Sequence, residues 1–177
     1  MENINWELLN DLKIGIVGCG HLGQAIAQTL VKRGLKKESL LISYGGNPLT
    51  YQKLEALGLA SCLAANKRLF QESGLVLITI KPQDILELQG TAASSKALVV
   101  SCMAGVPVEL LRHVLGTHVY RMMSSGPDTI LSGKGVAAIY PEHEHLKLLR
   151  LKKRNNPDRR DFFRDSVNYK KSIKFCG

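Results

Sequence analysis

The sequence predicts an α/β fold in which helices cover both faces of a mostly parallel sheet, and two observations predict it. Short apolar runs alternate with helical patterns from about residue 13 to residue 140, which is typical of parallel strands joined by crossover helices. The first apolar run is followed by the pattern Gly18-x-Gly20-x-x-Gly23 and then by an apolar-periodic stretch. We therefore expect one α/β domain over residues 1–150, followed by a basic tail over residues 151–177.

The apolar runs and helical patterns give the order of a Rossmann-like βαβ series. Strands are expected at Lys13–Val17, Leu40–Ser43, Ala60–Leu63, Leu75–Ile80, Ala97–Cys102 and His118–Met122, with a further strand, Gly135–Tyr140, at one side of the sheet. Helices are expected at Leu22–Arg33, Thr50–Leu57, Lys67–Ser73, Ile85–Leu88 and Val108–Leu115. Gly34 and Gly116 stand where the first and last of these helices should end, because glycine readily takes the left-handed conformation that ends helices.

The glycine pattern has a mechanical interpretation. Gly18 permits a tight turn, Gly20 lets the backbone approach a pyrophosphate, and Gly23 allows the helix to pack closely on the strand. The amide groups at the helix start then face the phosphates, aided by the helix dipole. The sequence therefore predicts a dinucleotide site, with an accidental glycine-rich turn as the alternative.

The end of the second expected strand bears on which dinucleotide is bound. NAD-binding sites usually carry an acidic residue here for the ribose 2′-hydroxyl, yet none occurs from Ser39 through Gln52. Ser43 and Asn47 offer hydrogen-bond donors for a 2′-phosphate. We therefore favour NADP over NAD, with a plain polar turn as the alternative.

Two further strand ends carry candidate site residues. Lys81 comes just before Pro82 and would point a cation into the cofactor crevice, or else be a solvated lysine at the start of a loop. Small residues in Met103-Ala104-Gly105 would let the backbone approach a nicotinamide ring. We interpret Cys102 as a buried thiol rather than a nucleophile, because nothing in the sequence suggests a base for it.

Composition narrows the class of protein. The net charge of +9 is concentrated in the tail: residues 1–146 have 13 Lys and Arg against 12 Asp and Glu, whereas residues 147–177 have 11 against 3. The four cysteines are scattered, which argues against a metal site or a disulfide framework. No apolar run approaches the ~20 residues of a membrane span, and the first residues lack the features of a secretory signal. We expect a cytoplasmic protein that acts on a small molecule and contacts no membrane.

The basic tail admits three interpretations. It is a solvated or disordered extension, a basic arm whose Phe162, Phe163 and Tyr169 stack on nucleic-acid bases, or a non-native ending. The neutral body of the domain argues against nucleic-acid binding, which we rank last.

Four pieces of the chain together resemble the pyrroline-5-carboxylate reductase family: KIGIVGCGHLG (13–23), ITIKPQ (78–83), LVVSCMAGVP (98–107) and, more loosely, RMMSSGP (121–127). The resemblance covers roughly residues 13–140. It implies an NADP-dependent oxidoreductase that transfers a hydride from NADPH to the C=N carbon of 1-pyrroline-5-carboxylate, giving proline. It also implies a cofactor groove lined by Val17, Gly18, Gly20, His21, Leu22, Gly23, Ser43, Asn66, Ile80, Lys81, Pro82, Met103, Ala104 and Gly105. Ser43 would lie at the adenosine ribose end.

The chain departs from the family pattern in two places. The family's Met-x-Asn-Thr-Pro is replaced by Met123-Ser124-Ser125-Gly126-Pro127. The family also continues into a helical domain that forms the dimer and most of the substrate pocket, and the pattern stops here near Arg150. We therefore expect a truncated or frameshifted member, for which a homo-oligomer would lack its usual dimerisation domain. A catalytically incomplete NADP-binding module is the main alternative, and no catalytic residue is assigned.

Overall fold

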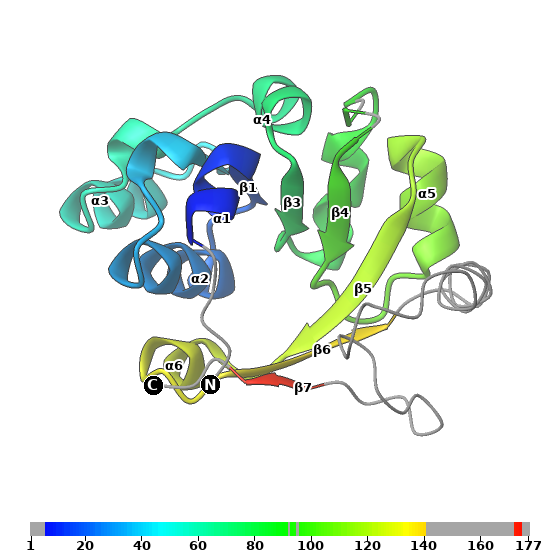
Figure 1. The fold of residues 1–177 in the computed structure, drawn as a ribbon. Helices are drawn as coiled ribbons and strands as arrows, with labels where there is room; N and C mark the ends of the chain where they lie inside the picture. Colours follow the sequence, from blue (N-terminus) through cyan, green and yellow to red (C-terminus); the bar gives the residue numbers. More distant parts are fainter. Residues whose placement is uncertain (1–5, 92, 95, 141–171, 175–177) are drawn as a thin grey trace.

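The computed structural model describes residues 6–91, 93–94, 96–140 and 172–174, which form one sheet with helices on both faces (Figure 1). The strand order is β2-β1-β3-β4-β5-β6-β7. The strands are β1 (Ile14–Val17), β2 (Leu40–Ser43), β3 (Leu75–Ile78), β4 (Leu98–Ser101), β5 (Val119–Ser124), β6 (Val136–Tyr140) and β7 (Ser172–Lys174). The first five run parallel to one another, whereas β6 and β7 pair antiparallel. The predicted fold class is confirmed.

Helices precede β1 and lie between most of the later strands. They are α1 (Trp6–Leu12), α2 (His21–Lys32), α3 (Pro48–Ala56), α4 (Asn66–Glu72), α5 (Val108–Leu115) and α6 (Pro127–Leu131), with short 3-10 helices η1 (Lys37–Ser39), η2 (Ala60–Cys62) and η3 (Pro82–Leu88). Gly116 ends α5 in the left-handed conformation, with φ 61°, and Gly34 takes φ 120° just after α2. Both glycines therefore stand at helix ends, as the sequence predicts.

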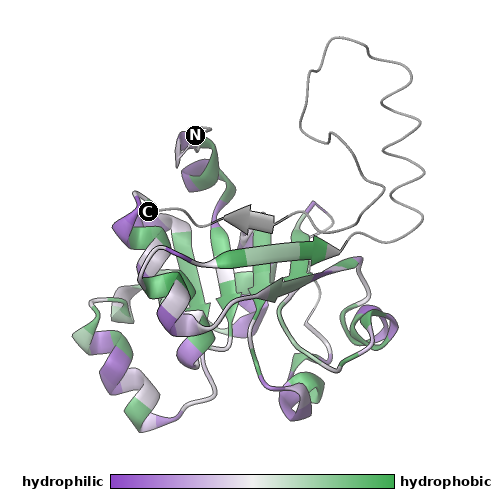
Figure 2. Ribbon diagram, turned by 90° about the horizontal axis from the view of Figure 1, so that it is seen from below, coloured by the Kyte–Doolittle hydropathy of each residue, from purple (hydrophilic) through white to green (hydrophobic). Residues whose placement is uncertain are grey.

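Alternating side chains of the parallel strands build two hydrophobic cores, one on each face of the sheet. Ile14 and Ile16 of β1 pack on the face covered by α2 and α6. Val17 packs on the opposite face, which is covered by α4, η3 and α5. This period-2 division is the expected behaviour of strands buried on both sides. Seen from below, the strands are largely apolar while the helices carry hydrophilic segments (Figure 2).

The strand predicted at Ala60–Leu63 is wrong. Residues Ala60–Cys62 form η2, in which the amides of Cys62 and Leu63 donate back to the carbonyls of Leu59 and Ala60. Leu63 makes one isolated parallel bridge with Ile42, so the segment touches the edge of β2 without adding a strand. A short apolar run buries its side chains equally well as a strand or as a turn, which is why periodicity alone misled here.

One predicted helix has another type in the structure, and two helices of the structure were not predicted. The helix expected at Ile85–Leu88 is the end of the longer 3-10 helix η3. The helices α1 and α6 were not predicted. Trp6 of α1 packs against the core of the α2 face, and Gly34 lies beneath it, with its ideal Cβ position 3.6 Å from the indole ring.

The predicted tail, residues 151–177, lies outside the described residues except for Ser172–Lys174. These three residues form β7, which pairs with β6 through the register Ala137↔Ile173. In the described part of the chain, every helix is too short or too polar to cross a membrane.

Candidate dinucleotide site

The topology places the carboxyl ends of β1 and β3 side by side at one edge of the sheet, where we expect a ligand crevice. β1 lies between β2 and β3 in the sheet. The chain leaving β1 enters α2, whose Ile26 packs on one face, and the chain leaving β3 enters η3, whose Ile85 packs on the other. Ligands of open α/β sheets bind where connections diverge in this way. The glycine turn and the Lys81–Pro82 segment border this crevice.

Gly18 makes the tight turn after β1. Its φ is +84°, and a Cβ there would meet the side chain of Ile80 and lie 2.9 Å from the Ile80 backbone nitrogen. The Gly18 amide donates to the carbonyl of Ser43, 3.1 Å away. The turn is thus anchored to the end of β2 and passes too close to the segment after β3 for any side chain at this position.

Gly23 lets α2 approach the turn. A Cβ at this position would collide with the Gly18 carbonyl oxygen and lie 2.8 Å from the Thr79 hydroxyl. That hydroxyl donates to the carbonyls of both Gly18 and Val17, the latter at 3.2 Å. Thr79 was not among the predicted site residues, although it stands within the ITIKPQ piece that the sequence singles out.

Gly20 is the position that faces open space. It is the residue before α2, and a Cβ placed on it would meet nothing within 4 Å. It has no side chain to cap the helix, so the first amides of α2 are left for a ligand. His21, the first residue of α2, is exposed, and Leu22 is partly buried. A phosphate at this helix start would be favoured by these amides and by the helix dipole.

Asn66, at the start of α4, carries an unsatisfied buried atom. Its Oδ1 is buried and has no hydrogen-bond partner in the described part of the chain. Ala64, two residues earlier, donates its amide to the carbonyl of Ile42 at 2.8 Å, so Asn66 lies near the end of β2. An unpaired buried acceptor costs free energy, and a ribose hydroxyl would supply the missing donor. The residues of the crevice therefore fit a dinucleotide.

The loop after β4 forms a further border of the site. Ser101 is fully buried, and its hydroxyl accepts a hydrogen bond from the Met103 amide at 3.2 Å. Ala104 and Gly105 are exposed, and Gly105 takes φ +75°. Arg121 of β5 donates to the carbonyls of Met103, at 3.1 Å, and Val106. Arg121 was not predicted as a site residue, although it is the first residue of the RMMSSGP piece.

The remaining predicted residues contribute in different ways. Val17 and Met103 are buried in the core, so only their backbones are available to a ligand. Ser43 is also buried, and Ile80 is partly buried against the Gly18 turn. Lys81 is exposed just before Pro82, which begins η3. Asn47 has a structural role that the sequence did not predict. Its Oδ1 accepts hydrogen bonds from the amides of Leu49 and Thr50 and so caps α3.

The described cysteines are protonated thiols at neutral pH. Burial raises the pKa of Cys102 to about 12. Burial, and secondarily the neighbouring Cys62, raises that of Cys19 to about 12. Cys102 is only partly buried, in contrast to the predicted buried thiol, but its raised pKa agrees with the expectation that it is not a nucleophile, since a nucleophilic cysteine needs a lowered pKa. Among the described residues, no group of three or more His, Cys, Asp or Glu is arranged to hold a metal ion.

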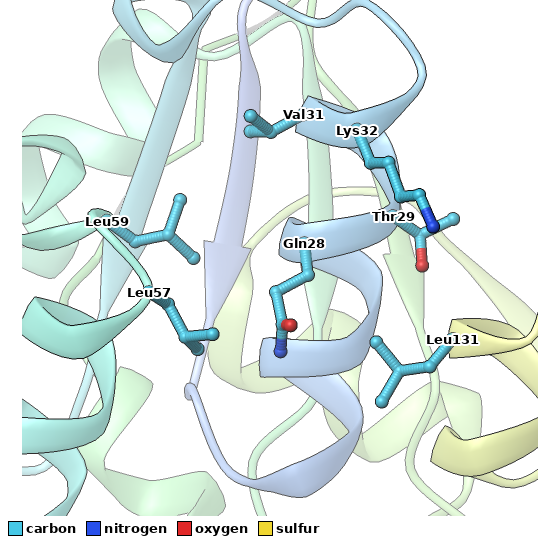
Figure 3. A pocket seen from close by; sticks show the side chains of 7 residues that line it. All are labelled: Gln28, Thr29, Val31, Lys32, Leu57, Leu59 and Leu131. Atoms are coloured by element: carbon cyan, nitrogen blue, oxygen red, sulfur yellow. The ribbon is translucent and has the colours of Figure 1, made fainter.

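A separate pocket of about 510 Å³ lies beside the C-terminal half of α2 (Figure 3). Its lining residues are Gln28, Thr29, Val31, Lys32, Leu57, Leu59 and Leu131. The glycine turn is at the opposite end of α2, so this pocket is not part of the dinucleotide crevice.

The topology and the glycine turn define a Rossmann domain of the class that binds pyridine nucleotides. The family model described as "NADP oxidoreductase coenzyme F420-dependent" matches residues 13–105. The chain belongs to this family. The matched segment runs from the start of β1 to the loop after β4, and so contains every predicted site residue.

Comparison with individual proteins supports the resemblance that the motifs indicate. The chain is 30% identical over 131 residues to a pyrroline-5-carboxylate reductase of Aquifex aeolicus, covering 72% of this chain and 47% of that protein. The 1-pyrroline-5-carboxylate reductase of Streptococcus pyogenes superimposes with a TM-score of 0.61 at 23% identity, over 80% of this chain and 54% of that one. A Plasmodium falciparum pyrroline carboxylate reductase with NADP bound gives 0.57 at 18% identity, over 79% and 53%. The chain spans about half the length of the curated relatives that it matches.

Proposed function

We propose that this chain binds NADP(H) at the β1/β3 crevice and forms the cofactor-binding part of an oxidoreductase that reduces 1-pyrroline-5-carboxylate to proline. The observation that carries the proposal is the difference between the surroundings of the three glycines in the turn. Gly18 and Gly23 have no room for a side chain, while Gly20 faces open space at a helix start. That combination meets the needs of a pyrophosphate site. The substrate follows from the names of the relatives.

The roles of the residues follow from their positions. The amides at the start of α2 would bind the pyrophosphate, and Asn66 Oδ1 would accept a hydrogen bond from the adenosine ribose, near Ser43. The exposed Ala104–Gly105 backbone would face the nicotinamide end. When bound, the reduced nicotinamide supplies the hydride. The protein's task is to hold the ring and the imine face to face in a fixed orientation.

The preference for NADP over NAD is part of the proposal. No acidic residue stands from Ser39 through Gln52, so no carboxylate there would repel a 2′-phosphate or pair with a 2′-hydroxyl. Asn47 uses its Oδ1 to cap α3, which leaves its amide nitrogen as a donor at this end.

NADPH oxidation by the purified chain, followed by absorbance with and without 1-pyrroline-5-carboxylate, tests the proposal. Substrate-dependent oxidation, absent when NADH replaces NADPH at the same concentration, is the expected result. A Gly20→Val variant is the matched control, because the added side chain enters the space for the pyrophosphate. Failure to oxidise NADPH while still binding it would refute the reductase assignment and leave the binding site.

That outcome is the second candidate function: a dinucleotide-binding module without turnover. It is supported by the family model, whose match over residues 13–105 covers the dinucleotide site. Saturable NADPH binding without substrate-dependent oxidation would establish it.

The proposal also covers the protein's cellular location and its partners. We place the reaction in proline biosynthesis in the cytoplasm, with a small-molecule substrate and neither membrane nor nucleic-acid partners; a homo-oligomer is compatible with it. The near-neutral charge of residues 1–146 supports the exclusion of nucleic acid. Salt-dependent DNA or RNA binding by the chain would contradict it.

A further inference from the structure

We propose that Arg121 is a positioning residue that holds the loop after β4 in the shape required by the nicotinamide end of NADPH. The inference rests on the proposed function, because the loop is assigned to the nicotinamide only through it. Arg121 does not touch the cofactor in this account. It acts through the backbone of the segment that does.

The hydrogen bonds of Arg121 bracket the exposed part of the loop. Nη1 donates to the Met103 carbonyl at 3.1 Å, and Nη2 donates to the Val106 carbonyl. Between these carbonyls stand Ala104 and Gly105, the two exposed residues of the turn. One guanidinium thus fixes both sides of a two-residue apex.

The other constraint on the loop comes from Ser101. Its hydroxyl accepts from the Met103 amide at 3.2 Å, so Met103 is held at its amide by β4 and at its carbonyl by β5. Its side chain is buried in the core. The apex itself has space around it: a Cβ on Gly105 would meet nothing within 4 Å. The loop is therefore held firmly at its base and open at its tip.

Sheet register places Arg121 beside the point where the loop leaves the sheet. Arg121 is paired with Ser101, the last residue of β4, in the parallel β4–β5 ladder. The ion pairs of Glu72 with Lys13 and with Arg68 do not involve Arg121. Its partly buried charge is directed at backbone carbonyls. A planar group with several fixed donors suits this task better than a lysine, which presents one ammonium.

A purely structural role would affect all parts of the site alike, whereas a positioning role predicts a selective effect. The adenosine end is assigned near β2, and three strand spacings separate β2 from β4, roughly 14 Å. Loss of the Arg121 bonds should therefore weaken contacts at the nicotinamide end and spare those at the adenosine end.

Calorimetric titration of the full chain with NADPH and with adenosine 2′,5′-bisphosphate, which lacks the nicotinamide half, makes this distinction. For Arg121→Met we expect an NADPH affinity lower by about tenfold and an unchanged affinity for the bisphosphate. Arg121→Lys keeps the charge but has its donors on a single nitrogen, and it should give a smaller, equally selective loss. If the methionine variant does not fold, the affinities of the lysine variant for the two ligands are compared with those of the wild type instead. Arg68→Met, which removes an exposed guanidinium from α4, should leave both affinities unchanged.

Each other outcome counts against a specific claim. Equal losses for both ligands would make Arg121 a general structural residue and overturn the inference, as would unchanged NADPH affinity in both Arg121 variants. If the wild-type chain bound neither ligand, the proposed function itself would fail and the inference with it. Selective loss in Arg121→Met, with partial recovery in Arg121→Lys, supports it.

Discussion

The Thr79 hydroxyl donates a hydrogen bond to the carbonyl of Gly18, which ties the segment after β3 to the glycine turn after β1. The same hydroxyl reaches the Val17 carbonyl at 3.2 Å, and the Thr79 amide donates to that carbonyl at 2.8 Å. Gly23 is packed against this hydroxyl. The turn's shape therefore depends on a side chain from the segment after β3 as well as on its own glycines.

Replacing Thr79 by valine tests this dependence. Valine keeps the branched shape but removes the donor, so the free energy of unfolding should fall by about 1–2 kcal/mol and NADPH affinity should fall several-fold as the turn loosens. Thr79→Ser keeps the donor and should retain most of the affinity. Denaturant unfolding and calorimetry measure the two effects. Equal NADPH affinity in the valine variant and the wild type would show that the hydroxyl does not shape the turn.

Gly18→Ala should destabilise the fold itself. The residue has φ +84°, and its new methyl group would meet the Ile80 side chain and lie 2.9 Å from the Ile80 backbone nitrogen. Overpacking combined with a strained backbone costs about 1–3 kcal/mol or more. Thermal and denaturant unfolding report the loss. A variant as stable as the wild type would mean that β1 and the segment after β3 separate easily.

Gly20→Val separates binding from folding. Because a Cβ at Gly20 meets nothing within 4 Å, the unfolding midpoint should change little. The side chain would nevertheless occupy the space beside the first amides of α2, so NADPH affinity should drop by at least about tenfold. Calorimetry paired with thermal unfolding checks both halves of the prediction. Retained NADPH affinity would place the pyrophosphate elsewhere.

Cys102 should make stability depend on pH in the alkaline range. Burial raises the pKa of its thiol from 9.0 to about 12, so above about pH 9 the unfolded chain loses this proton while the folded chain keeps it. Stability is then lost as pH rises from about 9 toward 12. Cys102→Ala removes this contribution, and its free energy of unfolding should decline less steeply over that range. Parallel curves for the two proteins would show that the folded thiol titrates normally.

The sequence was sufficient for those features that depend on local pattern. The parallel strands from β1 to β4 appear as apolar runs because they are largely buried on both faces. The glycine turn is recognisable because each glycine has a fixed backbone role. The strand predicted at Ala60–Leu63 failed because Leu63 touches Ile42 through a single bridge. Whether an apolar run enters a sheet depends on neighbours that are distant in sequence.

The same reasoning explains which site residues were missed. Thr79 and Arg121 act through hydrogen bonds to the carbonyls of Gly18 and Met103, which are 61 and 18 residues away in the chain. No spacing rule connects a side chain to backbone that distant. Asn66 was placed by family resemblance, and its buried, unpartnered Oδ1 now gives that placement a physical reason.

Amide hydrogen exchange of the full chain, with and without saturating NADPH, tests the dinucleotide site most directly because it locates the ligand on the backbone. Exchange should slow in peptides covering residues 17–23, 79–82 and 103–105, which border the crevice. It should stay unchanged along α1, which lies at the amino end of β1. Protection confined to other segments, such as the pocket beside the C-terminal half of α2, or no protection at all at saturating NADPH, would contradict the account.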